Sequence, residues 1–289
     1  MGKTLGRPIL RNIGRPSHHA QRVIPPASGL PEDSLQIPSP SFALVVSHCP
    51  WRPDRAEIMR NVRPILNRHG VPYCEITERA PNHVWSRKMW GWGAAQSTTH
   101  TVYLQDDLQV HEAFWDVVHA MVKAVPNRII SLISNHPLSH RALDEGHAWF
   151  RMSETLGSGY IVPTALMRIF LDHRLHIPER LAASLCEDFI LSRWQYETGR
   201  RSWCPIPTVI QTIESVPSTN PAIYYPYRRS YIPWTDPRVS GRPITDIGYW
   251  TPQRPPPDFG ATVSNDSRMP RGPFADHEII GAHQAAVRR

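Results

Sequence analysis

Short apolar runs and segments of helical periodicity alternate through the middle of this chain. Runs at 42–47, 71–77, 101–108 and 128–134 are rich in β-branched and aromatic residues, which is typical of buried strands. Between them, over 54–70, 84–96 and 111–124, apolar residues recur at helical spacing. Because helices that connect parallel strands cover the faces of their sheet, the pattern predicts an α/β fold. We expect a mostly parallel central sheet with helices on both faces.

The second half of the pattern is weaker. After residue 134 the sequence indicates a histidine-containing loop, and the Gly-Ser-Gly tripeptide at 157–159 then introduces a strand and a helix over 164–173. Glu187 and Asp188 begin another predicted helix, and 205–212 has the composition of a strand. These elements extend the predicted domain toward its carboxyl end.

Both ends of the chain lack such periodicity and are rich in proline. Residues 1–40 are predicted to form a basic, disordered arm, and residues 236–289 a largely irregular tail. The globular domain is therefore placed at 41–235. Two roles are open for the arm, a solvated leader and a contact with nucleic acid.

Composition narrows the class of protein. The chain has 289 residues, 40% of them hydrophobic, and 32 Lys and Arg against 25 Asp and Glu, giving a formal charge of +7 that favours polyanionic partners. Its four cysteines show neither zinc-ligand spacing nor a disulfide framework. The sequence has no apolar run of the roughly 20 residues that span a bilayer and no signal-peptide core. We expect a soluble, cytoplasmic protein without a membrane span.

The strongest chemical signal is the acid pair Asp106 and Asp107 at the end of the run 101–108. Open α/β sheets bind ligands at the carboxyl ends of their strands. Two carboxylates there can hold a hard divalent cation, which in turn can bridge the phosphates of a nucleotide. The alternative is that these acids turn the chain and cap the next helix.

Other polar positions follow predicted strands or begin predicted helices. The loop after the first strand contains Ser47 and Arg52, and Lys88 lies on the polar side of the helix 84–96. Glycine-rich phosphate loops of the dinucleotide-binding and Walker types are absent from the sequence. Glu187 and Asp188 are open to two interpretations, as caps of a helix and as carboxylates directed into a cleft.

The order of these signals resembles the GT-A class of nucleotide-sugar glycosyltransferases over about residues 42–225. The resemblance rests on the first strand and its polar loop, Gln-Asp-Asp at 105–107, Gly-Ser-Gly-Tyr at 157–160, Glu-Asp at 187–188 and Pro-Ser-Thr at 217–219. Gln-Asp-Asp looks like the DxD-type metal motif of that class. One position departs from the pattern, because Gln211 stands where many such enzymes supply a late histidine to the metal.

The resemblance implies a metal-dependent transfer that inverts the anomeric centre. Mn²⁺ or Mg²⁺ would bind Asp107, aided by Asp106, and the expected donor is a UDP-sugar. Asp188 would be the catalytic base, with Glu187 as the less favoured choice. The remaining implied positions are donor contacts at Ser47, Arg52, Lys88, Gln105 and Asp106, and an acceptor or sugar pocket at Gly157, Ser158 and Gly159.

The acceptor is not specified by the sequence. Its basic charge suits a polyanion, including a hydroxylated base in DNA, while glycans and small molecules stay open. Two other classes compete with the transferase. One is a catalytically inactive GT-A-like module that binds nucleic acid or a partner protein. The other is a metal-dependent nuclease or phosphoryl-transfer enzyme, which the lack of a second acidic cluster disfavours.

Overall fold

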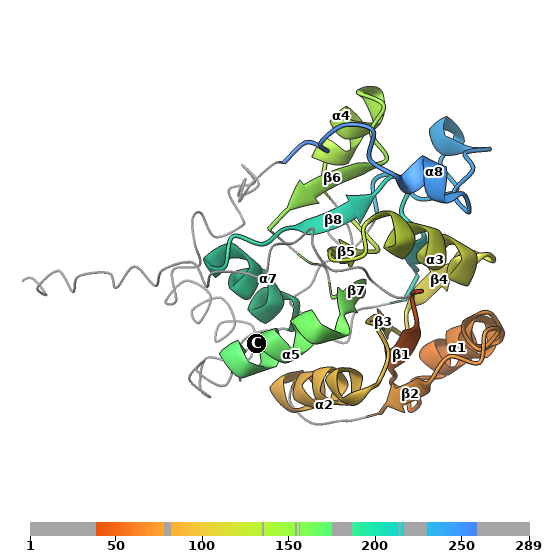
Figure 1. Ribbon diagram of the computed structural model, residues 1–289. Coiled ribbons are helices and arrows are strands. Elements are labelled where there is room, and N and C mark those ends of the chain that lie inside the picture. Colours follow the sequence, from red (N-terminus) through yellow and green to blue (C-terminus); the bar gives the residue numbers. More distant parts are fainter. Residues whose placement is uncertain are drawn as a thin grey trace, which may run out of the picture.

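The structure, a computed structural model, describes residues 39–77, 82–134, 136–153, 155, 157–174, 187–213, 215–216 and 230–258 (Figure 1). Within these ranges the side chains of residues 82–85, 174, 187 and 189 are not described. Most of the predicted arm, the end of the predicted tail and the Pro-Ser-Thr motif at 217–219 lie outside the described residues.

The first half of the domain alternates strands and helices as predicted, except that a short strand, β4, follows β3 directly. Its elements are β1 (Phe42–Ser47), α1 (Pro53–Leu66), β2 (Tyr73–Ile76), α2 (Asn82–Ala95), β3 (His100–Gln105), β4 (Leu108–Val110), α3 (Phe114–Ala124) and β5 (Ile129–Ser131). The second half comprises α4 (Leu138–Asp144), β6 (Trp149–Met152), β7 (Gly159–Pro163), α5 (Thr164–Arg174), α7 (Glu187–Glu197), β8 (Ser202–Pro205), β9 (Ile210–Thr212), the 3₁₀ helix η2 (Pro237–Val239) and α8 (Ile247–Trp250).

In the part of the chain that is described, a seven-stranded sheet has the order β2-β1-β3-β7-β5-β8-β6. Strands β2, β1, β3, β5 and β8 run in one direction, and β7 and β6 run in the other. A small second sheet pairs β4 with β9 in antiparallel fashion. The predicted α/β class with a mostly parallel central sheet is therefore confirmed.

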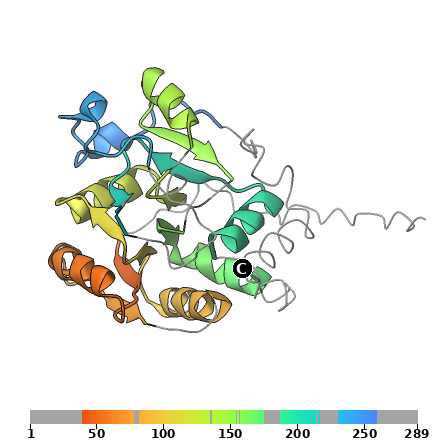
Figure 2. The same ribbon diagram turned by 180° about the vertical axis from the view of Figure 1, so that it is seen from behind.

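Helices cover both faces of this sheet (Figures 1 and 2). Leu44 of β1 points into a core with α1 and α3, whereas its neighbour Val45 points into a second core with α2, α5 and α7. Successive residues of a strand face opposite sides, so a strand buried on both faces must be apolar throughout. This is why the sequence of β1 is a continuous apolar run.

Two predictions about the chain need correction. The histidine-containing segment after residue 134 forms α4 and β6, and a further strand, β8, lies before the one predicted at 205–212. The packed domain also continues past residue 235. Trp250 is 0% exposed, and its ring packs against that of Trp149 with 5.0 Å between the ring centroids.

No described helix has both the length and the apolar character needed to cross a membrane.

Candidate functional site at the carboxyl edge of the sheet

The acid pair lies at an edge of the sheet where several polar segments meet. Asp106 and Asp107 directly follow β3, and His48 directly follows the parallel strand β1. The antiparallel strand β7 begins at the same edge, and Ser158 just before it accepts a hydrogen bond of 3.0 Å from the Gln105 amide. Strand pairing thus places the loop after β1, the acid pair and the Gly-Ser-Gly loop next to one another.

Both acids are buried and are held by a cation of the chain itself. Asp106 is 3% exposed and Asp107 is 0% exposed. The guanidinium Nη1 of Arg55 lies 2.7 Å from Asp106 Oδ1 and 2.9 Å from Asp107 Oδ2. Because one guanidinium contacts both carboxylates, it offsets part of the repulsion between them.

Asp106 is also anchored to the loop after β1. Its Oδ2 lies 2.9 Å from the ring nitrogen Nδ1 of His48 and accepts a hydrogen bond of 2.6 Å from the Cys49 amide. A carboxylate with three protein partners has a fixed orientation. Asp106 therefore joins the end of β3 to the loop that follows β1.

Arg55 lies in an unusual position for a cation. It is only 2% exposed in the first turn of α1, where the helix dipole disfavours positive charge. Burial lowers the pKa of the Arg55 guanidinium, whereas nearby Asp106 raises it. A guanidinium still keeps its proton near neutral pH. The acid pair is the compensating interaction for this buried charge.

The late strand β9 closes the other side of the acid pair. The Ile213 amide donates a hydrogen bond of 2.9 Å to the Asp107 carbonyl, and β9 pairs with β4 immediately after the acids. Gln211 on β9 accepts a hydrogen bond of 3.2 Å from the Ser230 amide through Oε1. At the position of the expected late histidine, the chain thus has Gln211, whose side chain forms a hydrogen bond with the start of the segment at Ser230.

Asp188, the predicted base, lies at the same edge of the sheet. It is the second residue of α7, is half-buried, and its Oδ2 lies 3.4 Å from the Gly157 amide, a long hydrogen bond. Gly157 adjoins Ser158, which contacts the amide of Gln105 beside the acid pair. Glu187 is the first residue of α7, and its side chain is not described.

The predicted donor contacts are distributed unevenly around the acid pair. Ser47 ends β1 and is paired in register with Gln105, so both lie at the edge beside the acids. The Arg52 guanidinium instead contacts Asp54, and this hydrogen bond is the largest cause of the raised pKa of Arg52. Lys88 is exposed in the middle of α2. The cation that contacts both acids is Arg55, which the sequence did not single out.

Gly159 has a packing role in addition to its predicted place at a pocket. A Cβ atom there would lie 2.3 Å from Ile210 Cδ1 and 3.0 Å from Leu104 Cδ2. These contacts would be too close for any larger residue without a shift of the neighbours. The glycine therefore lets β7 pack closely against the strand that leads into the acid pair.

The described carboxylates at this edge do not form a complete metal site on their own. Among the described residues, no group of three or more His, Cys, Asp and Glu side chains is placed to hold a metal. A metal at Asp106 would compete with the contacts to Arg55, His48 and the Cys49 amide. Mg²⁺ commonly uses one or two carboxylates, with substrate phosphates and water supplying the other ligands. Asp107, which is 0% exposed and also contacts Arg55, is the acid to which the resemblance assigns the metal.

Sequence reasoning missed Arg55 and did not assign His48 to the site. The contact between Arg55 and Asp106 joins residues 51 positions apart, and no local periodicity encodes such a pair. One signal was present in the sequence, since a basic residue follows Asp54 in a first helical turn, where acids are preferred. An arginine in that position calls for a compensating anion.

Comparisons with known proteins show little similarity in sequence and a partial similarity in structure. No protein-family model matches this chain, and no curated protein does. Among solved structures, the chain is similar to the crystal structure of a glycosyltransferase involved in the glycosylation of the major capsid of PBCV-1. The two are 13% identical, the match covers 48% of this chain and 69% of the other, and the TM-score is 0.29.

Proposed function

We propose that the chain is a glycosyltransferase that moves a sugar from a nucleotide-sugar donor to an acceptor hydroxyl at the carboxyl edge of the sheet. The observation that carries the proposal is the buried acid pair, fixed by Arg55 and His48 beside the loop that contacts Asp188. The strand order, with acids after β3 and a returning β9, is in keeping with the GT-A resemblance of the sequence.

The donor would bind between the loop after β1 and the acid pair. Ser47 and Gln105 lie there, and Arg52 and Lys88 are the proposed contacts farther out. Asp107 would hold Mn²⁺ or Mg²⁺, whose charge neutralises the departing diphosphate. Asp106 would keep the loop and the acid pair in register through its three contacts. A UDP-sugar is the proposed donor.

Asp188 would act as the catalytic base on the acceptor, with Glu187 as the second choice. The acceptor oxygen forms a bond to the anomeric carbon while the bond from that carbon to the diphosphate oxygen breaks. The electron pair leaves with the diphosphate, and the acceptor proton passes to Asp188. A single displacement of this kind inverts the anomeric centre. The loop 157–159 would shape the pocket for the sugar or the acceptor.

For the acceptor we propose a polyanion, with a hydroxylated base in DNA as the specific candidate. The formal charge of +7 supports this choice, because cations on a protein release the counterions of a polyanion on binding. Binding to duplex DNA should weaken steeply as salt rises, and it should also weaken when residues 1–40 are deleted. Binding insensitive to both changes would exclude DNA as the acceptor.

One observation favours a second candidate, a catalytically inactive binding module. Arg55 already neutralises part of the acid pair, as a purely structural ion cluster would. Thermal unfolding with manganese and a panel of nucleoside diphosphates separates the two. The transferase predicts stabilisation that needs both metal and nucleotide, whereas stabilisation by DNA alone, without metal, would favour the module.

Two substitutions test the assignment of the carboxylates. Asp188→Asn should lower transfer by roughly 10²–10⁴-fold, because the base is lost, while nucleotide binding stays near normal. Asp107→Asn should abolish the metal-dependent part of nucleotide binding. Asp116→Asn, at an exposed position of α3, is the matched control. Parental transfer rates in both site variants would refute the assignment, and donor–acceptor pairs screened by mass spectrometry supply the assay.

A further inference from the structure

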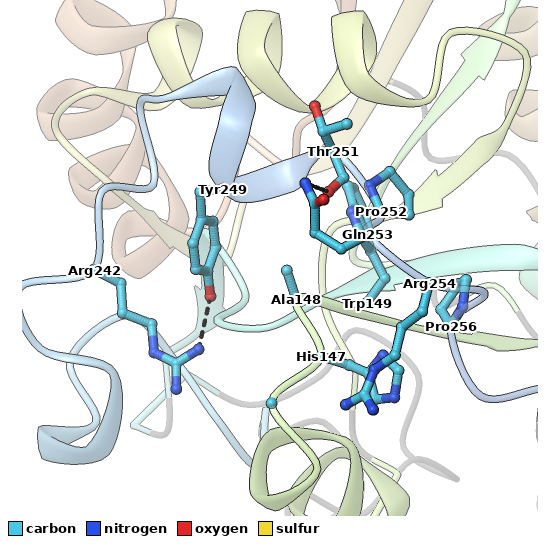
Figure 3. A pocket seen from close by; sticks show the side chains of 11 residues that line it. His147, Ala148, Trp149, Arg242, Tyr249, Thr251, Pro252, Gln253, Arg254 and Pro256 are labelled. Atoms are coloured by element: carbon cyan, nitrogen blue, oxygen red, sulfur yellow. Dashed lines mark hydrogen bonds between the residues drawn. The ribbon is translucent and has the colours of Figure 1, made fainter.

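A hollow with basic side chains lies beside α8 and the start of β6 (Figure 3). We call it the basic hollow, and its lining includes Arg242, Tyr249 and Arg254 together with His147 and Gln253. Figure 3 shows Arg242 and Tyr249 on one side, and Arg254 close to His147 on the other. Two guanidinium groups from different segments thus border one cavity.

The basic hollow lies at the same edge of the sheet as the acid pair. Strand β6 runs antiparallel to β3, so it begins at the edge where β3 ends. His147 and Ala148 lie just before β6, and the Ala148 carbonyl accepts a hydrogen bond of 2.8 Å from the Ile206 amide. Strands β7, β5 and β8 separate β3 from β6. At about 4.8 Å per strand, the two sites are roughly 19 Å apart along the sheet.

Both arginines have donor groups available for a ligand. Arg242 Nη1 donates a hydrogen bond of 3.1 Å to the Tyr249 hydroxyl, and Arg254 Nη2 donates to the Glu145 carbonyl. These neutral acceptors leave the guanidinium charges in place. Within the described ranges, no carboxylate forms an ion pair with either side chain. A guanidinium has five N–H donors and binds oxyanions through two of them at once.

Among the residues that line the basic hollow, Arg242 and Arg254 carry positive charge and none is an acid. Burial, and then the charge of Arg254, lower the pKa of His147, while Glu145 acts in the opposite direction. The Nε2 atom of His147 lies 3.9 Å from Glu145 Oε2, a long and partly exposed contact. An anion between the two arginines would meet more positive than negative charge.

The volume of the basic hollow and the residues that line it favour a small ligand. The cavity volume is about 170 Å³, below the roughly 300–1,000 Å³ of pockets for larger organic ligands. Tyr249 and the prolines Pro252 and Pro256 give it flat, partly apolar walls. A tetrahedral oxyanion, alone or on a small sugar, matches such a space better than a nucleotide does.

We propose that the basic hollow is a second ligand-binding site of this protein, which takes a phosphate group between Arg242 and Arg254. The group can come from free inorganic phosphate or from a small phosphorylated sugar, whose ring would contact Tyr249. This binding does not depend on the transfer reaction proposed above.

The experiment is a titration of the full chain with inorganic phosphate and, separately, with ribose 5-phosphate, followed by ³¹P NMR. Saturable binding is expected for at least one of them. Arg254→Met and Arg242→Met should each weaken it by about tenfold or more, because each removes a charge-assisted contact. Tighter binding of ribose 5-phosphate identifies a phosphorylated sugar, and equal or weaker binding identifies the free anion.

Arg60→Met is the matched control, since it removes one positive charge from an exposed position on α1. It should leave phosphate binding unchanged. Thermal unfolding verifies that each variant is folded, and Arg254, which is exposed, is the less demanding position to change. The proposal is overturned if the parent shows no saturable binding, or if Arg60→Met weakens binding as much as Arg254→Met does.

Discussion

The two edges of the central sheet bury polar side chains in different ways. At the amino edge, His100 begins β3 and is 1% exposed, with Nε2 at 2.7 Å from the Pro126 carbonyl and Nδ1 at 2.9 Å from the Thr99 hydroxyl. At the carboxyl edge, Asp106 and Asp107 follow the same strand and contact Arg55. One strand therefore ends in neutral hydrogen bonds on one side and in a cluster of charges on the other.

This difference separates structural polar residues from candidate functional ones. The partners of His100 are neutral groups, and its imidazole lies beside the ring of Phe42, with 6.0 Å between the two ring centroids. Buried charges are costly unless they are paired, and replacing a buried ion pair by apolar residues is often neutral or stabilising. Stability alone is therefore a weak reason for the charged cluster at the carboxyl edge, and this edge is the better candidate for chemistry.

The largest expected effect on stability comes from Arg55→Met. It leaves two buried carboxylates without their shared cation, and removal of one partner from a buried ion pair typically costs about 3–5 kcal/mol. We expect the free energy of unfolding at neutral pH, measured with urea, to fall by that order. Adding Asp107→Asn to the variant should restore part of the loss, because one of the stranded charges is then removed.

The matched control is Arg52→Met, at the arginine that the resemblance implies as a donor contact. Its side chain is 25% exposed and paired with the partly exposed Asp54, so removal should cost about 1 kcal/mol or less. If Arg52→Met destabilised the protein as much as Arg55→Met, the claim that the buried ion pairs of Arg55 contribute more to stability than the partly exposed pair of Arg52 would be wrong.

The sequence predicted the central strands and helices well for a physical reason. β1 and β3 are buried on both faces, and α1 and α3 on one, so their apolar patterns are long and regular. The pattern failed at α4, which is a short helix, and at β6, where Arg151 interrupts the apolar run. Such short elements are set by contacts with distant segments.

The candidate site was predictable only in part. The carboxyl end of a buried strand is visible in sequence, so Asp106 and Asp107 could be placed at the sheet edge. Their partner could not be placed, because the position of Arg55 depends on how α1 packs beside β4. Gly159 was assigned to an acceptor or sugar pocket, whereas the structure also gives it tight packing against Ile210.

A second prediction concerns the pH dependence of the amino edge. Burial, partly offset by the hydrogen bond to Pro126, lowers the pKa of His100 from 6.5 to about 4. Between these values the unfolded chain binds a proton at this residue and the folded chain does not, so stability falls as pH falls through this window. The loss should be about 3 kcal/mol and complete near pH 4.

His100→Gln isolates this effect, because the amide can still donate to Pro126 but does not titrate. Subtracting the two urea-denaturation profiles removes the other groups that titrate in the window, including the nearby His119, whose pKa burial also lowers. Parallel profiles for the parent and the variant from pH 7 to pH 4 would mean that His100 is protonated in the folded protein.

A smaller effect than those of Arg55→Met and His100→Gln is expected for Gly159→Ala at the carboxyl edge. The added methyl would meet Ile210 Cδ1 at 2.3 Å, and overpacking of this kind costs about 1–3 kcal/mol. Ile210→Val removes the clashing atom, so the double variant should be more stable than the sum of the single changes predicts.

Gly91→Ala is the control, because nothing lies within 4 Å of its added Cβ in the exposed part of α2. This change should stabilise the folded protein by about 0.5–1 kcal/mol. On the proposed function, a stably folded double variant that binds nucleotide more weakly than the parent would place Gly159 beside the ligand as well. Binding equal to that of the parent would leave Gly159 a packing role alone.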